Sequence, residues 1–199
     1  SDYTIREYIC NFIMSKLEAN TIDTVSGTTN LVIGSTNTST VTVPNGKVTG
    51  QNYPLFGVRL SANQTGLADN VPTLIQFDTV DFDTNSGFNT STYTYTVPTG
   101  MGGKYLISAC VHFHHPGQIN YNNTQIYKNG SKLRETQFNS KSGDYEDEDS
   151  QMIITVEDFS AGDTIQIYGN ANSGDGTDTR VTGGNNENHS FWRAYRIGA

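Results

Sequence analysis

The segment from residue 77 to residue 115 limits what this 199-residue chain can fold into more than any other stretch. It holds the longest run of strand-forming residues and the chain's only cluster of histidines. Within it, residues 103–115 would place bulky side chains on both faces of one strand. A strand of that kind is covered on both sides, so this segment predicts the centre of a layered β-structure.

The rest of the chain also favours an all-β fold. Asn, Thr, Ser, Gly and Tyr are abundant, while charged residues make up only 16%, against a usual quarter or so. Asn129-Gly130 predicts a tight hairpin, and residues 170–188, which have no periodicity, predict a long exposed loop. Short strands separated by turns are typical of an antiparallel jelly-roll sandwich, here over residues 53–199. The predicted strands are residues 54–61, 72–80, 91–98, 103–115, 124–130, 131–138, 151–159, 163–170 and 189–197.

The first 52 residues have a different character. Apolar residues recur every three or four positions within residues 1–20, which predicts a short amphipathic helix. Its apolar face would pack either on the β-domain or on copies of itself, and we favour self-association as a trimerising or anchoring segment. Residues 21–52 form either a β-stalk or a flexible linker, and the alternation in 30–34 and 39–46 favours a stalk.

Charge and cysteine content exclude several functions. The formal net charge is -8 and the twelve Lys and Arg are scattered, so we expect no nucleic-acid partner. No apolar run reaches the roughly 20 residues of a membrane-spanning helix, so we expect no membrane insertion. Cys10 and Cys110 are a hundred positions apart and do not form a disulfide framework.

The spacing of aromatic residues and glycines resembles a family signature. Phe77, Asp83 and Phe88 match its first positions, Tyr95 stands where Phe is usual, and Gly103 opens the closing Gly-x-Tyr segment. Residues 54–198 therefore resemble the globular head of complement component one subcomponent q, within the tumour-necrosis-factor-like jelly rolls. The turn after Tyr95 is longer than in that family, and Ala109 replaces an aromatic residue.

This resemblance implies a homotrimer in which one sheet face of each chain packs against its neighbours. The apolar face of the strand at 103–115 is the face that we assign to this contact. The predicted interface residues are Tyr105, Ile107, Ala109, Val111 and Phe113.

The sequence suggests two candidate metal sites, each with a structural alternative. Cys110, His112 and His114 alternate along one strand and could bind a soft metal, or could form a semi-polar interface layer. The acidic run at 144–149 could bind calcium, as the resemblance also implies, or could be a solvated loop that protects an edge strand. We expect that the protein requires no cofactor and that calcium is the one ion it could bind as a cofactor. The candidate calcium ligands are Asp144, Glu146, Asp147, Asp149, Asp175 and Asp178.

Aromatic residues in predicted loops are the candidates for recognition. Tyr121 and Tyr145 are flanked by amides and carboxylates, which suit a glycan or a protein receptor; the alternative is that they pack on neighbouring loops. We therefore assign receptor binding to Asn120, Tyr121, Asn122 and Tyr145. No nucleophile elbow or metalloprotease motif is present, so we expect no enzyme.

Together these features lead to a hypothesis of function. The helix-then-stalk beginning, the Asn/Thr/Gly-rich composition and a head without disulfides indicate a virion fibre or spike. Its head would lie at the virion surface and attach to a host glycan or protein receptor, and its N-terminus would contact other virion proteins. The alternative is a secreted or surface-displayed adhesion or signalling module of a cellular organism.

Overall fold

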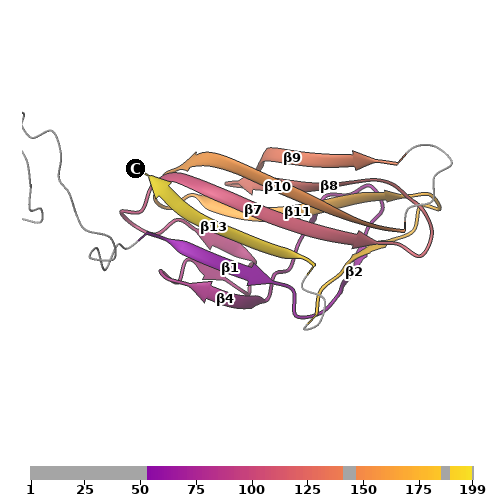
Figure 1. Cartoon of the computed structure of the whole chain (residues 1–199), viewed down its shortest axis with the longest axis horizontal. Coiled ribbons are helices and arrows are strands. Elements are labelled where there is room, and N and C mark those ends of the chain that lie inside the picture. The colour runs from indigo at the N-terminus through magenta and orange to yellow at the C-terminus, as the bar shows by residue number, and fades with distance from the viewer. Residues whose placement is uncertain (1–52, 141–146, 185–188, 199) are drawn as a thin grey trace, which may run out of the picture. The chain divides into compact units, whose positions relative to one another are not determined.

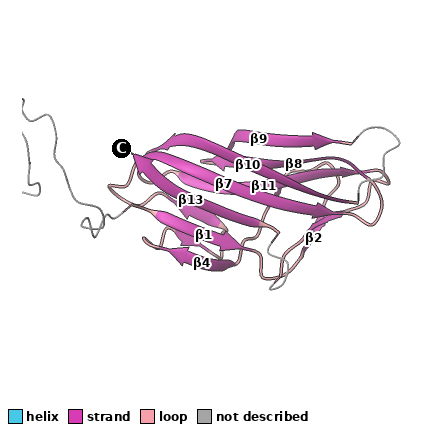
Figure 2. Ribbon diagram, in the orientation of Figure 1, coloured by secondary structure: helices cyan, strands magenta, loops and turns pink. Residues whose placement is uncertain are grey.

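The computed structural model describes residues 53–140, 147–184 and 189–198. Every regular element in these ranges is a strand, and none of their residues forms a helix that could cross a membrane (Figure 2). The helix predicted for residues 1–20 and the stalk predicted for residues 21–52 lie outside these ranges and stay predictions. The strands are β1 (Leu55–Arg59), β2 (Gln64–Leu67), β3 (Thr73–Leu74), β4 (Thr79–Asp83), β5 (Phe88–Asn89), β6 (Thr94–Thr96), β7 (Gly103–His114), β8 (Ile119–Lys128), β9 (Ser131–Asn139), β10 (Glu148–Phe159), β11 (Thr164–Ser173), β12 (Thr179–Val181) and β13 (Phe191–Gly198).

The strands form two antiparallel sheets. The seven-stranded sheet has the order β2-β12-β7-β13-β1-β4, and β10 pairs with the other edge of β7 (Figure 1). The six-stranded sheet has the order β5-β6-β11-β8-β9, and β3 also pairs with β11. β7 is thus paired along both of its edges, with β10 on one and with β12 and β13 on the other.

One hydrophobic core joins the two sheets face to face. Ile107 of β7 and Ile167 of β11 belong to the same buried cluster, although they come from different sheets. The Trp192 side chain is fully buried there and makes edge contacts with the rings of Phe56 and Phe88. Side chains from the inner faces of both sheets therefore meet in one core, which confirms an all-β sandwich.

The hairpin predicted at Asn129-Gly130 is confirmed. Both residues have positive φ, 51° and 76°, as a two-residue turn between right-twisted strands requires. The Asn129 side chain also accepts a hydrogen bond from the Thr164 amide (2.8 Å) and donates one to Asp163 (2.7 Å). The turn is therefore tied to the start of β11.

The long loop predicted for residues 170–188 is wrong in part. Asn170 to Ser173 complete β11, and Thr179 to Val181 form β12. The sequence gives no apolar alternation here because amide and hydroxyl side chains occupy buried positions; Asn170, Ser173 and Thr179 are all buried. Backbone pairing with β8 and β7 fixes these strands instead.

Candidate functional site: assembly and recognition surfaces

The five residues predicted for the trimer interface are in the core of a single chain. All five side chains have no exposed surface within one chain, so they cannot contact a neighbour. The assignment to this face of β7 was wrong because the second sheet, which the pattern of one strand does not reveal, already covers it. These residues are Tyr105, Ile107, Ala109, Val111 and Phe113.

The opposite face of the seven-stranded sheet exposes apolar side chains. Strand pairing places Val156 of β10 beside Leu106 of β7, Leu106 beside Tyr195 of β13, and Tyr195 beside Leu55 of β1. Met152 and Ile154 extend this row along β10, and Ile154 is 62% exposed. We call these six residues the apolar row.

Further apolar side chains flank the row. Phe82 of β4 is exposed and its ring lies over Gly57, where a Cβ atom would come within 2.6 Å of it. Ile197 of β13 is also exposed. A contiguous apolar surface of this kind marks an interaction site, because isolated soluble chains rarely leave one uncovered. Sequence reasoning missed it, although the alternation in residues 151–159 is the signal that places Met152, Ile154 and Val156 on one face.

Three histidines lie close together on the same face, near the C-terminal end of β7. His112 and His114 each have a ring nitrogen close to a Glu148 carboxylate oxygen, at 3.8 and 3.6 Å, and the His189 ring lies 4.7 Å from that of His112. Burial, aided by the proximity of His189, lowers the pKa of His112, although Glu148 and Asp149 oppose this shift. His112 is therefore held in its neutral form more firmly than a free histidine.

The soft-metal hypothesis gains no support from this cluster. Burial raises the pKa of the Cys110 thiol, which disfavours the thiolate that binds metals. His112 Nδ1 lies 2.7 Å from the Ser150 hydroxyl. Within the described ranges, no three His, Cys, Asp or Glu side chains group closely enough to hold a metal ion.

The calcium candidates are dispersed where the structure describes them. Asp149 accepts a hydrogen bond from Gln151 (2.6 Å), and Asp175 accepts two from Thr177 and lies 3.4 Å from the buried His115 ring. Asp147 and Asp178 are exposed, while Asp144 and Glu146 lie outside the described residues. Calcium binding at 144–149 stays a prediction, which a melt with and without a chelator tests.

The predicted receptor residues are not in a loop. Asn120, Tyr121 and Asn122 belong to β8, and Asn122 is fully buried. The Tyr121 hydroxyl donates to Asn70, and the Asn120 amide donates to Asn172 (3.0 Å). Asn122 thus cannot reach a receptor, because neighbouring strands cover it. Tyr145 lies outside the described residues, and its role stays a prediction.

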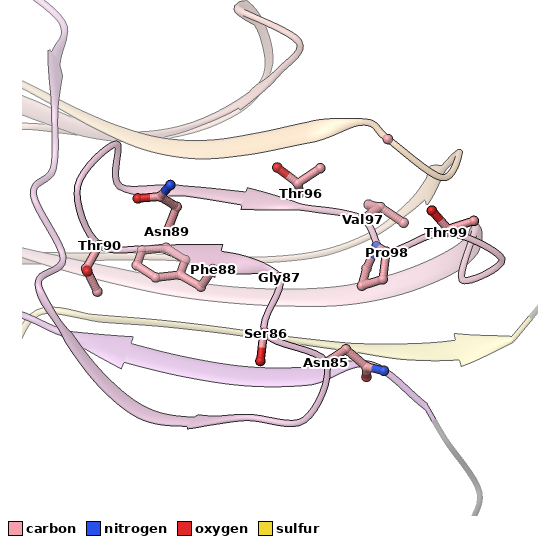
Figure 3. A pocket seen from close by; sticks show the side chains of 11 residues that line it. Asn85, Ser86, Gly87, Phe88, Asn89, Thr90, Thr96, Val97, Pro98 and Thr99 are labelled. Atoms are coloured by element: carbon pink, nitrogen blue, oxygen red, sulfur yellow. The ribbon is translucent and has the colours of Figure 1, made fainter.

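An open pocket of about 670 Å³ lies beside β5 and β6. Gly87 lines it in a position where a Cβ atom would be 2.6 Å from the Tyr95 ring and 2.9 Å from the Thr96 carbonyl oxygen. None of its lining residues is ionisable, so this pocket offers no acid or base for catalysis. The lining residues are Asn85, Ser86, Gly87, Phe88, Asn89, Thr90, Thr96, Val97, Pro98, Thr99 and Gly162 (Figure 3).

Comparisons with known proteins identify the fold. No protein-family model and no curated protein sequence matches the chain. The structure is similar to Eiger TNF from S. frugiperda, with a TM-score of 0.55 and 13% identity over 73% of this chain and 92% of that one. It is also similar to murine APRIL at pH 5.0, with a TM-score of 0.54 and 13% identity over 73% of this chain and 100% of that one. The globular domain of the zebrafish complement 1qA protein gives a TM-score of 0.48 and 15% identity, over 72% and 97% of the two chains. The described part of the chain therefore has the jelly-roll fold of tumour-necrosis-factor-like proteins.

Proposed function

We propose that the chain forms a homotrimer through the outer face of its seven-stranded sheet and that the trimer is a non-enzymatic recognition module. The observation that carries this proposal is the apolar row, which a single chain leaves exposed across four neighbouring strands. Burial of such a surface between copies is favourable, at about 25 cal/mol for each Å² of apolar area. The tumour-necrosis-factor-like resemblance supports three copies rather than two.

A role in recognition follows from what a trimer of this fold would present. Three identical chains around one axis display three copies of any binding face, so weak single sites act together on a target surface. The neutral lining of the open pocket also favours binding over catalysis. An extracellular setting agrees with this role.

The finer hypothesis of a virion fibre rests on the helix-then-stalk pattern of residues 1–52, the Asn/Thr/Gly-rich composition and a head without disulfides. The structural similarity to tumour-necrosis-factor-like proteins does not favour the virion fibre over the alternative, a secreted or surface-displayed adhesion or signalling module. The two differ in what the gene encodes upstream of this chain. A particle-anchoring segment or further β-repeats would favour the fibre, and a signal peptide or collagen repeats would favour the secreted module.

Sedimentation equilibrium of the full chain tests the proposed assembly. We expect a species of three times the 21.8 kDa of one chain, with a population that depends on concentration by mass action. Folded single chains at every concentration would overturn the proposal.

A further inference from the structure

The outer face of the six-stranded sheet has an unusual composition along its two central strands. The register of β8 and β11 pairs Tyr121 with Asn172, Asn123 with Asn170, Gln125 with Tyr168, and Tyr127 with Gln166. These eight residues alternate with core residues such as Ile126 and Ile167, so all eight lie on the outer side of the sheet. The three tyrosines, Gln166 and Asn172 are partly exposed there, while Asn123, Gln125 and Asn170 are buried between their neighbours. We call this set the tyrosine–amide face; it contains three tyrosines, five amides, no aliphatic side chain and no charge.

Two of the three tyrosine rings on this face are in contact, and the third lies farther along β8. The rings of Tyr127 and Tyr168 lie on diagonal positions of the two strands, with centroids 4.1 Å apart and planes inclined by 31°. Tyr121 lies six residues before Tyr127 on β8, a distance of about 20 Å along a strand. The face is therefore long enough for several sugar units rather than one.

The amide part of the face is held in place. Gln125 donates to Asn123 Oδ1 (2.8 Å), and Asn172 donates to the Asp69 carboxylate (3.1 Å). Gln125 and Asn170 are 2% and 7% exposed, yet Gln125 Oε1 and Asn170 Oδ1 have no hydrogen-bond partner among the described residues. Buried acceptors without a donor are costly, and a ligand hydroxyl reached by rotation of the amide would satisfy them.

The electrostatics of the surroundings select a neutral ligand. The nearest charges on β9, Lys132 and Glu135, pair with each other at 2.8 Å. Asp69 accepts hydrogen bonds from Asn172 and from the Ser173 amide (2.6 Å) and keeps its negative charge, which repels an anionic ligand. The eight residues of the face offer no cation for a phosphate, sulfate or carboxylate.

We propose that the tyrosine–amide face binds a neutral oligosaccharide. Tyrosine rings stack on the apolar faces of sugar rings, and each amide offers both a donor and an acceptor to sugar hydroxyls. This inference rests on the proposed recognition function and names its ligand class. The site differs from the predicted loop site in that only Tyr121 is shared and the binding surface is a rigid sheet.

A binding titration with the full chain tests the proposal. The probes are neutral hexasaccharides built from glucose, xylose, mannose, and alternating galactose and N-acetylglucosamine, with sialylated and sulfated forms of the last as the anionic arm. We expect at least one neutral probe to bind, and Tyr168→Ala to weaken that binding by about tenfold. Tyr168→Phe should retain most of the affinity because it keeps the ring.

Tyr53→Ala is the matched control, since Tyr53 is an exposed tyrosine far in sequence from both strands. A thermal melt establishes that each variant is folded. Equal affinities for Tyr168→Ala, Tyr53→Ala and the unchanged chain would overturn the proposal, as would binding confined to the anionic probes or no binding to any probe.

The experiment separates this inference from the proposed assembly. The face lies within one chain, so Val156→Asp, which disrupts the apolar row, should leave the affinity for a soluble hexasaccharide unchanged. A trimer that binds no neutral probe would overturn only the ligand class. A monomer whose binding depends on Tyr168 would overturn only the trimer.

Discussion

Val156→Asp should break the assembly and leave the head folded. Val156 is 48% exposed in a single chain and lies beside Leu106 in the apolar row. Covering the exposed half of a valine contributes about 0.8 kcal/mol, because burying the whole side chain is worth about 1.5 kcal/mol. An unpaired carboxylate buried at the same place costs about 3 kcal/mol more.

These effects act once per chain and therefore three times per trimer. The change is about 4 kcal/mol for one chain and about 12 kcal/mol for three, which lowers the association constant by roughly nine orders of magnitude. The fold should tolerate the change, since exposed substitutions alter the free energy of unfolding by about 0.5 kcal/mol. Sedimentation equilibrium should show single chains, and the urea midpoint of the variant should match that of the unchanged chain at dilutions where both are monomers.

Val71→Asp is the matched control. Val71 is the same residue with almost the same exposure, 49%, but it lies outside the seven-stranded sheet. This variant should remain a trimer. The reasoning is refuted if both variants associate equally, or if Val156→Asp is a trimer with unchanged affinity between its chains.

Three further predictions concern the fold and its ends. Because His112 has a lowered pKa, the unfolded state binds its proton more readily; stability is present above about pH 6.5 and is lost as the pH falls below it. The melting temperature should therefore drop between pH 7.5 and 5.5, and less so in His112→Gln; an identical drop in that variant would count against this cause. Asn129→Ala should cost about 2 kcal/mol in urea unfolding, because it places alanine at positive φ and removes two hydrogen bonds, whereas Asn129→Gly should lose only the bonds. Deletion of residues 1–50 should weaken association without lowering the urea midpoint of the head, and a fully dissociated or an unfolded product would contradict that expectation.

The sequence predicts the strands better than it predicts their faces. Alternation in residues 103–115 identifies β7, and Asn129-Gly130 identifies the hairpin between β8 and β9, because both signals are local. Which side of β7 meets the second sheet is not local, so the fully buried Tyr105 and Phe113 were assigned to the wrong surface.

The tyrosine–amide face could not be predicted from the sequence, because it also depends on how distant strands pair. Asn122 and Asn123 read as loop residues, since amides are common in turns, yet they pair with β11 and are buried. Backbone pairing with Ala171 and Asn170 decides their position, and no side-chain pattern in the sequence encodes that pairing. The tyrosine–amide face could be assembled only after the register of two strands was known.

Oxidation of Met152 is the most direct test of whether copies of the chain cover the apolar row. Met152 is 49% exposed in one chain and lies in that row, so its sulfur should react readily with peroxide unless a neighbour shields it. Peptide mass spectrometry on the full chain should show slow formation of the Met152 sulfoxide, with rapid formation in Val156→Asp under the same conditions. Equal, rapid oxidation of Met152 in both proteins would contradict the account, because the face would then be open to solvent in the native protein.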